Sequence, residues 1–217
     1  FTVDRNSTAT RVNSLGLIES VAANVPRLDY TDGNCPSLLL EPQGTNLFTY
    51  SQDFNSLTKE RTTVTVNATN SPEGLVTADK LVEDSSLNSH RVRDNISTVS
   101  GNDYTFSVYA KASERNKLRL FIGGSNASCE FDLVNGTLQN NTGTEANISL
   151  SANGFYRCSL TTTATATANT LFLIALLDDN YDFTYQGNGT SGFFIWGAQV
   201  EESSVASSYI PTSGTTV

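Results

Sequence analysis

The segment DYTFSVYAKA, residues 103–112, is the strongest sign of secondary structure in the chain, because polar and apolar side chains alternate along it. Its apolar set is Tyr104, Phe106, Val108 and Ala110, and its opposite set is Thr105, Ser107, Tyr109 and Lys111. A period of two residues is that of a half-buried β-strand. The stretch therefore predicts a central strand with one face in a core.

Similar segments recur between residues 62 and 201 and predict ten strands. Their ranges are 62–68, 78–83, 90–98, 103–112, 117–123, 129–133, 146–150, 155–164, 170–177 and 192–201. Asn135-Gly136 predicts a hairpin, since both residues tolerate positive φ. No segment has a convincing helical period. The pattern predicts an all-β fold, an antiparallel β-sandwich or jelly roll.

The two ends of the chain differ from this β-rich region. Residues 1–47 have scattered apolar residues and frequent Gly and Pro, which predicts an extended N-terminal arm that packs on the main domain or on a neighbour. Residues 203–217 are rich in Ser and Thr and predict a C-terminal tether. The expected organisation is an arm at 1–47, a jelly-roll β-sandwich at 48–202 and a tether at 203–217, as in a module of something larger.

Composition disfavours several classes of partner. The net charge of −9 opposes binding to nucleic-acid phosphates and to anionic membranes. No apolar run approaches the roughly 20 residues of a membrane span. The sequence contains no Met and no visible signal peptide, so we expect a processed product or a fragment. The three cysteines, Cys35, Cys129 and Cys158, are interpreted as buried free thiols, with a Cys129–Cys158 pair as the alternative.

Basic and aromatic side chains are concentrated on the predicted outward faces of four strands. The candidate carbohydrate-binding residues are Arg91, Arg93, Tyr109, Lys111, Arg119, Phe121, Phe155 and Arg157. Aromatic rings stack on sugar rings, and guanidinium groups donate to sugar hydroxyls and carboxylates. Interfaces are also rich in aromatic residues and Arg. The same residues therefore fit a glycan-binding surface or a face covered by the arm or by a second subunit.

Other polar residues give weaker signals. His90 is the only histidine and has no nucleophile-elbow partner, so we expect a surface residue. Catalysis of glycoside hydrolysis needs two carboxylates across one cleft. The acidic clusters are Glu83-Asp84, Asp178-Asp179 with Asp182, and Glu201-Glu202. No cofactor is expected, although the Asp178–Asp182 loop is a weak candidate for a structural Ca²⁺.

Several blocks, in order along the chain, resemble a domain of bacteriophage structural proteins. They are Arg5 with Ala9-Thr10, NVPR (24–27), LLLEPQGTNL (38–47), YSQDF (50–54), ADKL (78–81), YTFSVYAKA (104–112), FYRC (155–158), WGAQVEE (196–202) and SYIPT (208–212). The resemblance implies a jelly roll similar to carbohydrate-binding modules, a place in a phage tail, fibre or head decoration, and no catalysis. Three positions depart from the pattern. Gly44 stands where Arg is common, Phe155 where Trp is common, and Trp196-Gly197 where related modules carry an Asp-Asp pair associated with calcium.

Together these observations predict a non-catalytic module of the phage virion surface that binds glycans in adhesion or decoration. Its expected partners are other virion proteins, a polysaccharide of host or environment, and further copies of itself. The alternative is a purely structural protein that cements capsid or tail subunits without glycan affinity, and a polysaccharide-degrading enzyme is a third. In the closing strand, Phe194, Trp196, Ala198 and Val200 are expected on one side, which places the lone Trp in the core.

Overall fold

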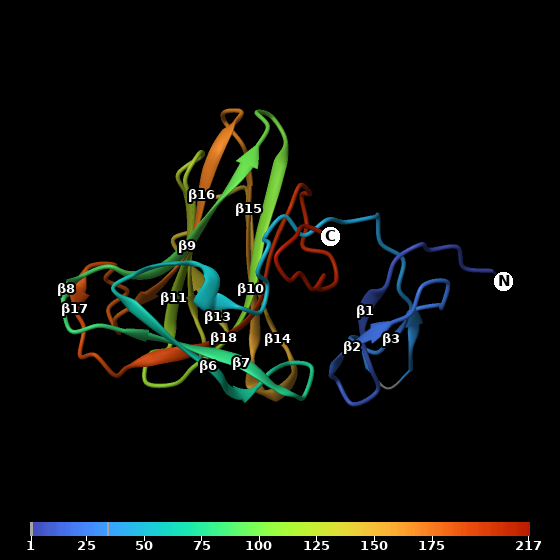
Figure 1. Ribbon diagram of the computed structural model, residues 1–217, viewed down its shortest axis with the longest axis horizontal. Coiled ribbons are helices and arrows are strands. Elements are labelled where there is room, and N and C mark those ends of the chain that lie inside the picture. The colour runs from blue at the N-terminus through green and yellow to red at the C-terminus, as the bar shows by residue number, and fades with distance from the viewer. Residues whose placement is uncertain (1, 34) are drawn as a thin grey trace.

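The structure is a computed structural model that describes residues 2–33 and 35–217. Two six-stranded antiparallel sheets pack face to face, and a smaller N-terminal lobe lies beside them (Figure 1). We call the first the β10 sheet. Its strands, in spatial order, are β14 (Glu145–Leu150), β15 (Tyr156–Thr163), β10 (Asp103–Lys111), β18 (Gly192–Glu201), β7 (Val76–Glu83) and β6 (Thr62–Asn70).

We call the second the β11 sheet. Its strands, in spatial order, are β13 (Thr137–Gln139), β12 (Ala127–Asp132), β11 (Lys117–Ile122), β16 (Ala168–Leu177), β9 (His90–Thr98) and β5 (Thr58–Glu60). A short pair, β8 (Leu87–Asn88) with β17 (Tyr185–Gln186), and two 3₁₀ turns, η1 (Phe54–Ser56) and η2 (Ala152–Gly154), complete the sandwich.

The chain crosses repeatedly between the two sheets, from β7 to β9, back to β10, then to β11, and later from β15 to β16 and to β18. This alternation is that of a jelly roll, so the predicted fold class is confirmed. All ten predicted strands are present. The hairpin predicted at Asn135-Gly136 is confirmed, because β13 pairs with β12 across that turn. The three-residue strand β5 was missed because it is too short to show a period. In the described residues, no helix is long and apolar enough to cross a membrane.

The main core lies between the inner faces of the two sheets. Phe106 of β10 meets Phe172 of β16 edge to face, with ring centroids 5.6 Å apart. Cys129 and Cys158 are buried in this core as free thiols, whereas Cys35 is exposed, contrary to expectation. Burial raises the pKa of the Cys129 thiol to about 11. Both core thiols therefore remain protonated and unreactive near neutral pH.

The N-terminal lobe, residues 2–33 and 35–41, has more regular structure than the predicted arm. It holds two short antiparallel pairs, β1 (Ala9–Val12) with β2 (Ile18–Val21) and β3 (Leu28–Asp29) with β4 (Ser37–Leu38). Side chains organise its turns: Asn13 Oδ1 accepts from the amides of Leu15 and Leu17, and the Arg5 guanidinium donates to four carbonyl oxygens. Such local bonds leave no hydrophobic period in the sequence.

The C-terminal segment, residues 203–217, packs back between the lobe and the sandwich instead of leaving as a tether (Figure 1). Tyr209 is buried, and its hydroxyl lies 2.7 Å from Ser51 Oγ. Thr212 Oγ1 donates to the Phe48 carbonyl at 2.6 Å. The Ser- and Thr-rich composition suggested a solvated segment, but these hydroxyls bond to the backbone and side chains of the sandwich.

A bulge in β18 changes the predicted sides of the closing strand. Ser107 opposes Gln199, but Tyr109 opposes Trp196, so β18 carries one extra residue there. Gly197 adopts φ +63°, which glycine tolerates best. Phe194 and Trp196 consequently face outward, while Ala198 and Val200 remain in the main core. The expectation that these four side chains share one side is therefore wrong.

Candidate functional site

The eight candidate residues lie on two opposite outer faces. Arg91, Arg93, Arg119 and Phe121 belong to the β11 sheet, and Tyr109, Lys111, Phe155 and Arg157 belong to, or directly precede, strands of the β10 sheet. Because the sheets pack inner face to inner face, the two groups point to opposite sides of the sandwich. The prediction that these eight residues form one surface is therefore wrong. Alternation identifies which residues point outward, but it does not show to which sheet a strand belongs.

The middle of the outer face of the β10 sheet is covered by the lobe and the C-terminal segment, whereas Lys111 and Arg157 remain partly exposed. Tyr109 and Phe155 are buried in a second apolar cluster with Trp196, with Ile18 of the lobe and with Tyr209 of the C-terminal segment. The rings of Trp196 and Tyr209 lie 4.4 Å apart. At this place the N-terminal lobe covers the sheet, as the alternative of arm packing predicts. Trp196 is buried on the outer side of the β10 sheet, under the lobe and the C-terminal segment, and not between the two sheets.

A row of outward side chains crosses all six strands of the β11 sheet. In cross-strand order the row is Gln139, Glu130, Arg119, Ala175, Arg91 and Glu60. Directly opposed residues of antiparallel strands point to the same face. Phe121, Leu173 and Arg93 lie side by side in the next row. With strands about 4.8 Å apart, the first row is about 24 Å long. We call it the polar row.

The arginines of this face are paired with carboxylates. Arg91 Nη2 lies 2.5 Å from Glu60 Oε2, Arg93 binds the other oxygen of Glu60, and Arg119 binds Glu130. Burial opposes ionisation of Glu60, but hydrogen bonds from the two arginines outweigh it and hold its pKa below the ordinary value. Arg119 Nε is shielded from solvent and has no hydrogen-bond partner in the described residues. Three arginines of this face thus share two carboxylates, which restrain the arginine side chains.

Phe183 and Tyr181 complete this face, and the sequence pattern missed them. The Phe183 ring lies 5.8 Å from the Arg91 guanidinium and 5.1 Å from that of Arg119. The Tyr181 ring lies 4.7 Å from Lys117 Nζ, and both rings remain partly exposed. They belong to the loop after β16, where no alternation marks a side chain as outward or inward.

The aspartate-rich loop that carries these rings is held in shape by its own hydrogen bonds. Asp178 Oδ1 accepts from the backbone amides of Asn180 and Asp182, which fixes the loop over the sheet. Among the residues described, no three His, Cys, Asp or Glu side chains are grouped as a metal ion would require.

Carboxylates of the other two acidic clusters also accept hydrogen bonds from neighbouring side chains. Glu83 is buried and accepts from Arg115, from the Tyr185 hydroxyl and from the Asn188 amide. Burial opposes ionisation of Glu83, but these bonds outweigh it and keep its pKa below the ordinary value. Glu202 accepts from Asn102 and Tyr104.

His90 is fully buried, so the predicted surface position is wrong. Its Nδ1 lies 2.9 Å from the Arg61 carbonyl oxygen, and the Tyr185 ring lies 4.8 Å away. Its Nε2 has no hydrogen-bond partner within the described part of the chain. Gly187 packs directly against the imidazole, because a Cβ there would come within 3.0 Å of it.

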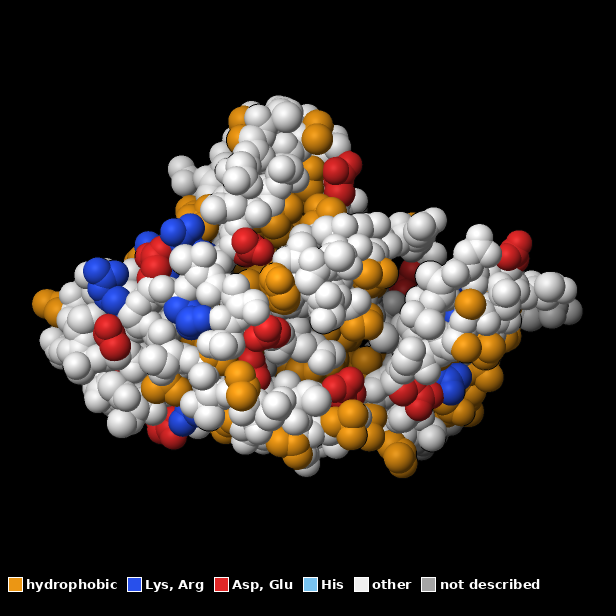
Figure 2. Space-filling model, in the orientation of Figure 1, with side chains coloured by type: hydrophobic (Ala, Val, Ile, Leu, Met, Phe, Trp, Pro, Cys, Tyr) orange, Lys and Arg blue, Asp and Glu red, His pale blue; other side chains and the backbone are white. Residues whose placement is uncertain are grey.

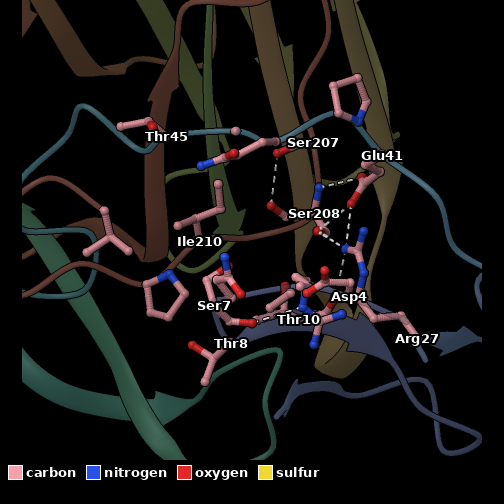
Figure 3. Close-up of a pocket in the computed structure, with 18 residues that line it drawn as sticks. Asp4, Ser7, Thr8, Thr10, Arg27, Glu41, Thr45, Ser207, Ser208 and Ile210 are labelled. Atoms are coloured by element: carbon pink, nitrogen blue, oxygen red, sulfur yellow. Dashed lines mark hydrogen bonds and ion pairs between the residues drawn. The ribbon is translucent and has the colours of Figure 1, made fainter. Parts of the chain in front are cut away.

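Two cavities flank the contact between the lobe and the sandwich, and a hollow is visible there in Figure 2. One of about 540 Å³ lies between residues 4–10, 41–45 and 207–211 (Figure 3). The other, of about 650 Å³, lies between the lobe and the β14 side of the β10 sheet. Thr10, Glu41, Ser207 and Ser208 border both cavities.

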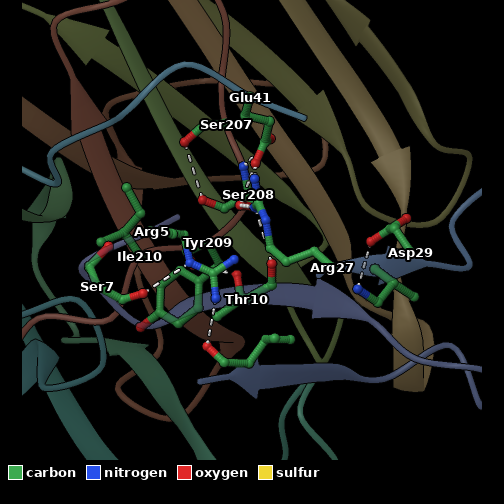
Figure 4. A network of polar contacts seen from close by, with 12 residues as sticks. Arg5, Ser7, Thr10, Arg27, Asp29, Glu41, Ser207, Ser208, Tyr209 and Ile210 are labelled. Carbon is green, nitrogen blue, oxygen red and sulfur yellow. Dashed lines mark hydrogen bonds and ion pairs between the residues drawn. The ribbon is translucent and has the colours of Figure 1, made fainter. Parts of the chain in front are cut away.

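A polar network separates these cavities and ties the lobe to the C-terminal segment (Figure 4). Buried Arg27 donates from Nη1 to Glu41 Oε2 at 2.6 Å and to Ser208 Oγ at 2.8 Å. Thr10 Oγ1 donates to the Tyr209 carbonyl at 2.5 Å. Four of the sequence blocks quoted above therefore meet at one place. Their common role is to hold the lobe against the sandwich.

Comparison with known proteins gives only distant similarities. No protein-family model matches the chain, and no curated protein gives a significant match. Among solved structures, it is similar to the enzymatically active domain of tailspike protein 4 of bacteriophage CBA120 (13% identity, TM-score 0.43, covering 71% of this chain and 21% of that chain). It is also similar to the CBM22-1–GH10 modules of xylanase 10B of Clostridium thermocellum (14% identity, TM-score 0.42, covering 76% of this chain and 29% of that chain). A third similar structure is TmCBM27, a carbohydrate-binding module that recognises mannan (8% identity, TM-score 0.38, covering 76% of this chain and 98% of that chain). The chain thus spans less than a third of the length of the first two of these structures.

Proposed function

We propose that this chain is a non-catalytic module of a phage particle that binds glycans through the outer face of the β11 sheet. The observation that carries the proposal is the polar row, in which Arg91 and Arg119 flank Ala175 and approach the ring of Phe183. The sequence blocks that resemble phage structural proteins support the assignment to a virion. Its place on the virion surface follows from the proposal that it meets polysaccharide there.

The chemistry of the face suits a sugar chain. Planar guanidinium and carboxylate groups donate to and accept from adjacent hydroxyls, and the Phe183 ring offers an apolar plate for the C–H face of a sugar. The ion pairs with Glu60 and Glu130 hold the arginines in place before binding, which reduces the entropy lost on association. Weak binding at one such face gains strength when many copies sit on one particle.

A glycan array with the full chain tests the proposal. We expect wild type to retain at least one class of polysaccharide, and Arg119→Gln and Phe183→Ala each to weaken retention by about tenfold. Lys80→Gln is the matched control, because Lys80 pairs with Glu114 at 2.7 Å on the β10 sheet. Circular dichroism establishes that the variants are folded. Retention of no glycan, or equal retention by all four proteins, contradicts the proposal.

A structural role without glycan affinity is the second candidate, and one observation favours it. The lobe exposes several leucines: Leu28 and Leu38 oppose each other across β3 and β4, and Leu40 is 81% exposed. Exposed apolar groups of this kind suit contact with another virion protein or a second copy of the chain. Under this alternative, Leu28→Asp with Leu40→Asp removes the protein from assembled particles, and the β11-sheet variants have no effect.

A further inference from the structure

The larger cavity beside the lobe has walls of different origin. One wall is the β10 sheet near its β14 side, with Tyr109, Arg157, Ser149 and Ser151. The other wall belongs to the lobe and includes Tyr30. Its volume of about 650 Å³ lies within the range of small-ligand sites. It is a cleft with tyrosine rings and hydroxyl groups on its walls, on the opposite side of the sandwich from the outer face of the β11 sheet.

Arg157 on the sheet wall lacks an anionic partner. Its Nη2 donates to Ser107 Oγ at 3.1 Å, and its guanidinium lies 5.3 Å from the centroid of the Tyr109 ring. Its Nε is shielded from solvent and has no hydrogen-bond partner in the part of the chain that is described. The arginines of the polar row, by contrast, all bind carboxylates. A partly buried guanidinium without a carboxylate partner gains from an anion that reaches its terminal nitrogens.

The carboxylates that border the cleft are mostly engaged elsewhere. Asp29 accepts from the backbone amides of Val12 and Thr31. Glu41 binds Arg27 and Ser208 within the polar network. Asp32 is exposed, and Arg11 on the lobe wall is paired with Glu19. Arg157 is therefore the cation of the cleft whose charge is not met by a carboxylate among the described residues.

We propose that this cleft binds a sugar that carries a carboxylate, such as a uronic acid unit of an acidic polysaccharide. The carboxylate accepts from the Arg157 guanidinium, the sugar ring lies between Tyr30 and the sheet wall, and Ser149 and Ser151 meet its hydroxyls. The inference shares with the proposed function only the class of ligand, because it uses the opposite side of the sandwich.

Titration calorimetry of the full chain tests this site. The probes are oligogalacturonate, oligoalginate and, as a matched neutral ligand, methyl-esterified oligogalacturonate. We expect at least one acidic probe to bind about tenfold more tightly than the ester, and Arg157→Gln to remove that difference. Lys111→Gln is the control, because Lys111 lies on the same sheet face but does not border the cavity. Tyr30→Ala, on the lobe wall, should weaken the same interaction.

The outcomes separate this site from the face of the β11 sheet. Arg119→Gln should leave the difference in affinity between the acidic probe and its ester unchanged, and Arg157→Gln should leave array retention of neutral polysaccharides unchanged. If array retention fails but Arg157-dependent binding persists, only the proposed function is lost. Absence of binding by both oligouronates, equal affinity for acid and ester, or unchanged binding by folded Arg157→Gln overturns the inference.

Discussion

The guanidinium of Arg119 on β11 lies 5.1 Å from the ring of Phe183, which comes from the loop after β16. This cation–π contact joins a residue that strand alternation identified to one that it missed. The same ring lies 5.8 Å from the Arg91 guanidinium. The loop therefore helps to fix the positions of the arginines in the polar row. We expect substitutions on the outer face of the β11 sheet to affect glycan binding, and substitutions under the lobe on the β10 sheet to affect stability.

Truncating Tyr109 should damage the fold instead of a binding surface. Tyr109 is buried against Trp196, with ring centroids 5.4 Å apart, beneath the lobe and the C-terminal segment. We expect Tyr109→Ala to lower the free energy of unfolding by about 3–5 kcal/mol, as for other buried aromatics. Phe183→Ala should cost about 1 kcal/mol, the scale of a partly exposed contact. Urea unfolding measures both, and equal losses would contradict this division.

Gly197 should not tolerate a side chain. Its φ of +63° disfavours L-residues, and a Cβ would lie 3.0 Å from Tyr109 Cδ2. We expect Gly197→Ala to cost about 2 kcal/mol or more, against about 1 kcal/mol for the control Gly101→Ala. Gly101 also has positive φ, but no atom lies within 4 Å of its added Cβ. Thermal denaturation that ranks the two variants equally would show that the bulge is not tightly packed.

The lobe should loosen when the network at Arg27 is broken. Arg27→Ala leaves Glu41 without its cation and Ser208 without a donor. Because Glu41 is partly exposed, we expect a cost of about 2 kcal/mol, below that of a fully buried pair. Hydrogen exchange should accelerate in residues 9–29 and 205–212 and remain unchanged in β11 and β16. Uniform acceleration over the whole chain would contradict a local role.

Acid should destabilise the fold partly through Glu83. Its folded-state pKa lies below the ordinary value of 4.5, so its ionised form stabilises the fold at pH above about 4.5. This contribution is lost as the pH falls through the lower, folded-state value. We therefore expect Glu83→Gln to be clearly less stable than wild type near neutral pH, and the difference to narrow as the pH falls below the ordinary value of 4.5. A stability difference that is independent of pH would contradict the assignment.

The three thiols should react very differently with a thiol reagent such as Ellman's reagent. Cys35 is exposed, whereas Cys129 and Cys158 lie in the main core with pKa values raised by burial. We expect one thiol to react in the native protein and all three after denaturation. Cys35→Ser should abolish the fast reaction. Rapid modification of more than one thiol in the native state would show that the core opens readily.

The sequence predicted the sandwich well because its strands carry their own period. Residues 103–111 alternate clearly, and the structure places Phe106 inside and Tyr109 outside as that pattern requires. Alternation does not specify which strands are neighbours, so it could not separate Arg119 from Arg157. It also failed where one extra residue at Gly197 reversed the alternation of β18.

The lobe and the C-terminal segment were underestimated for a different reason. Their structure depends on hydrogen bonds between distant residues, such as Arg27 with Ser208 and Thr10 with Tyr209. These contacts satisfy polar groups without burying periodic apolar side chains, so composition alone suggested solvated segments. The rings of Tyr181 and Phe183 escaped notice similarly, because a loop has no period.

The most direct test of the proposed glycan-binding face is to map a bound glycan by NMR. A polysaccharide fragment retained on the array is titrated into isotopically labelled protein, and backbone amide shifts are followed. The account predicts the largest changes at Arg91, Arg119, Ala175 and Phe183, with small changes in β6 and β7. Changes confined to other surfaces, with the polar row unaffected, would contradict it.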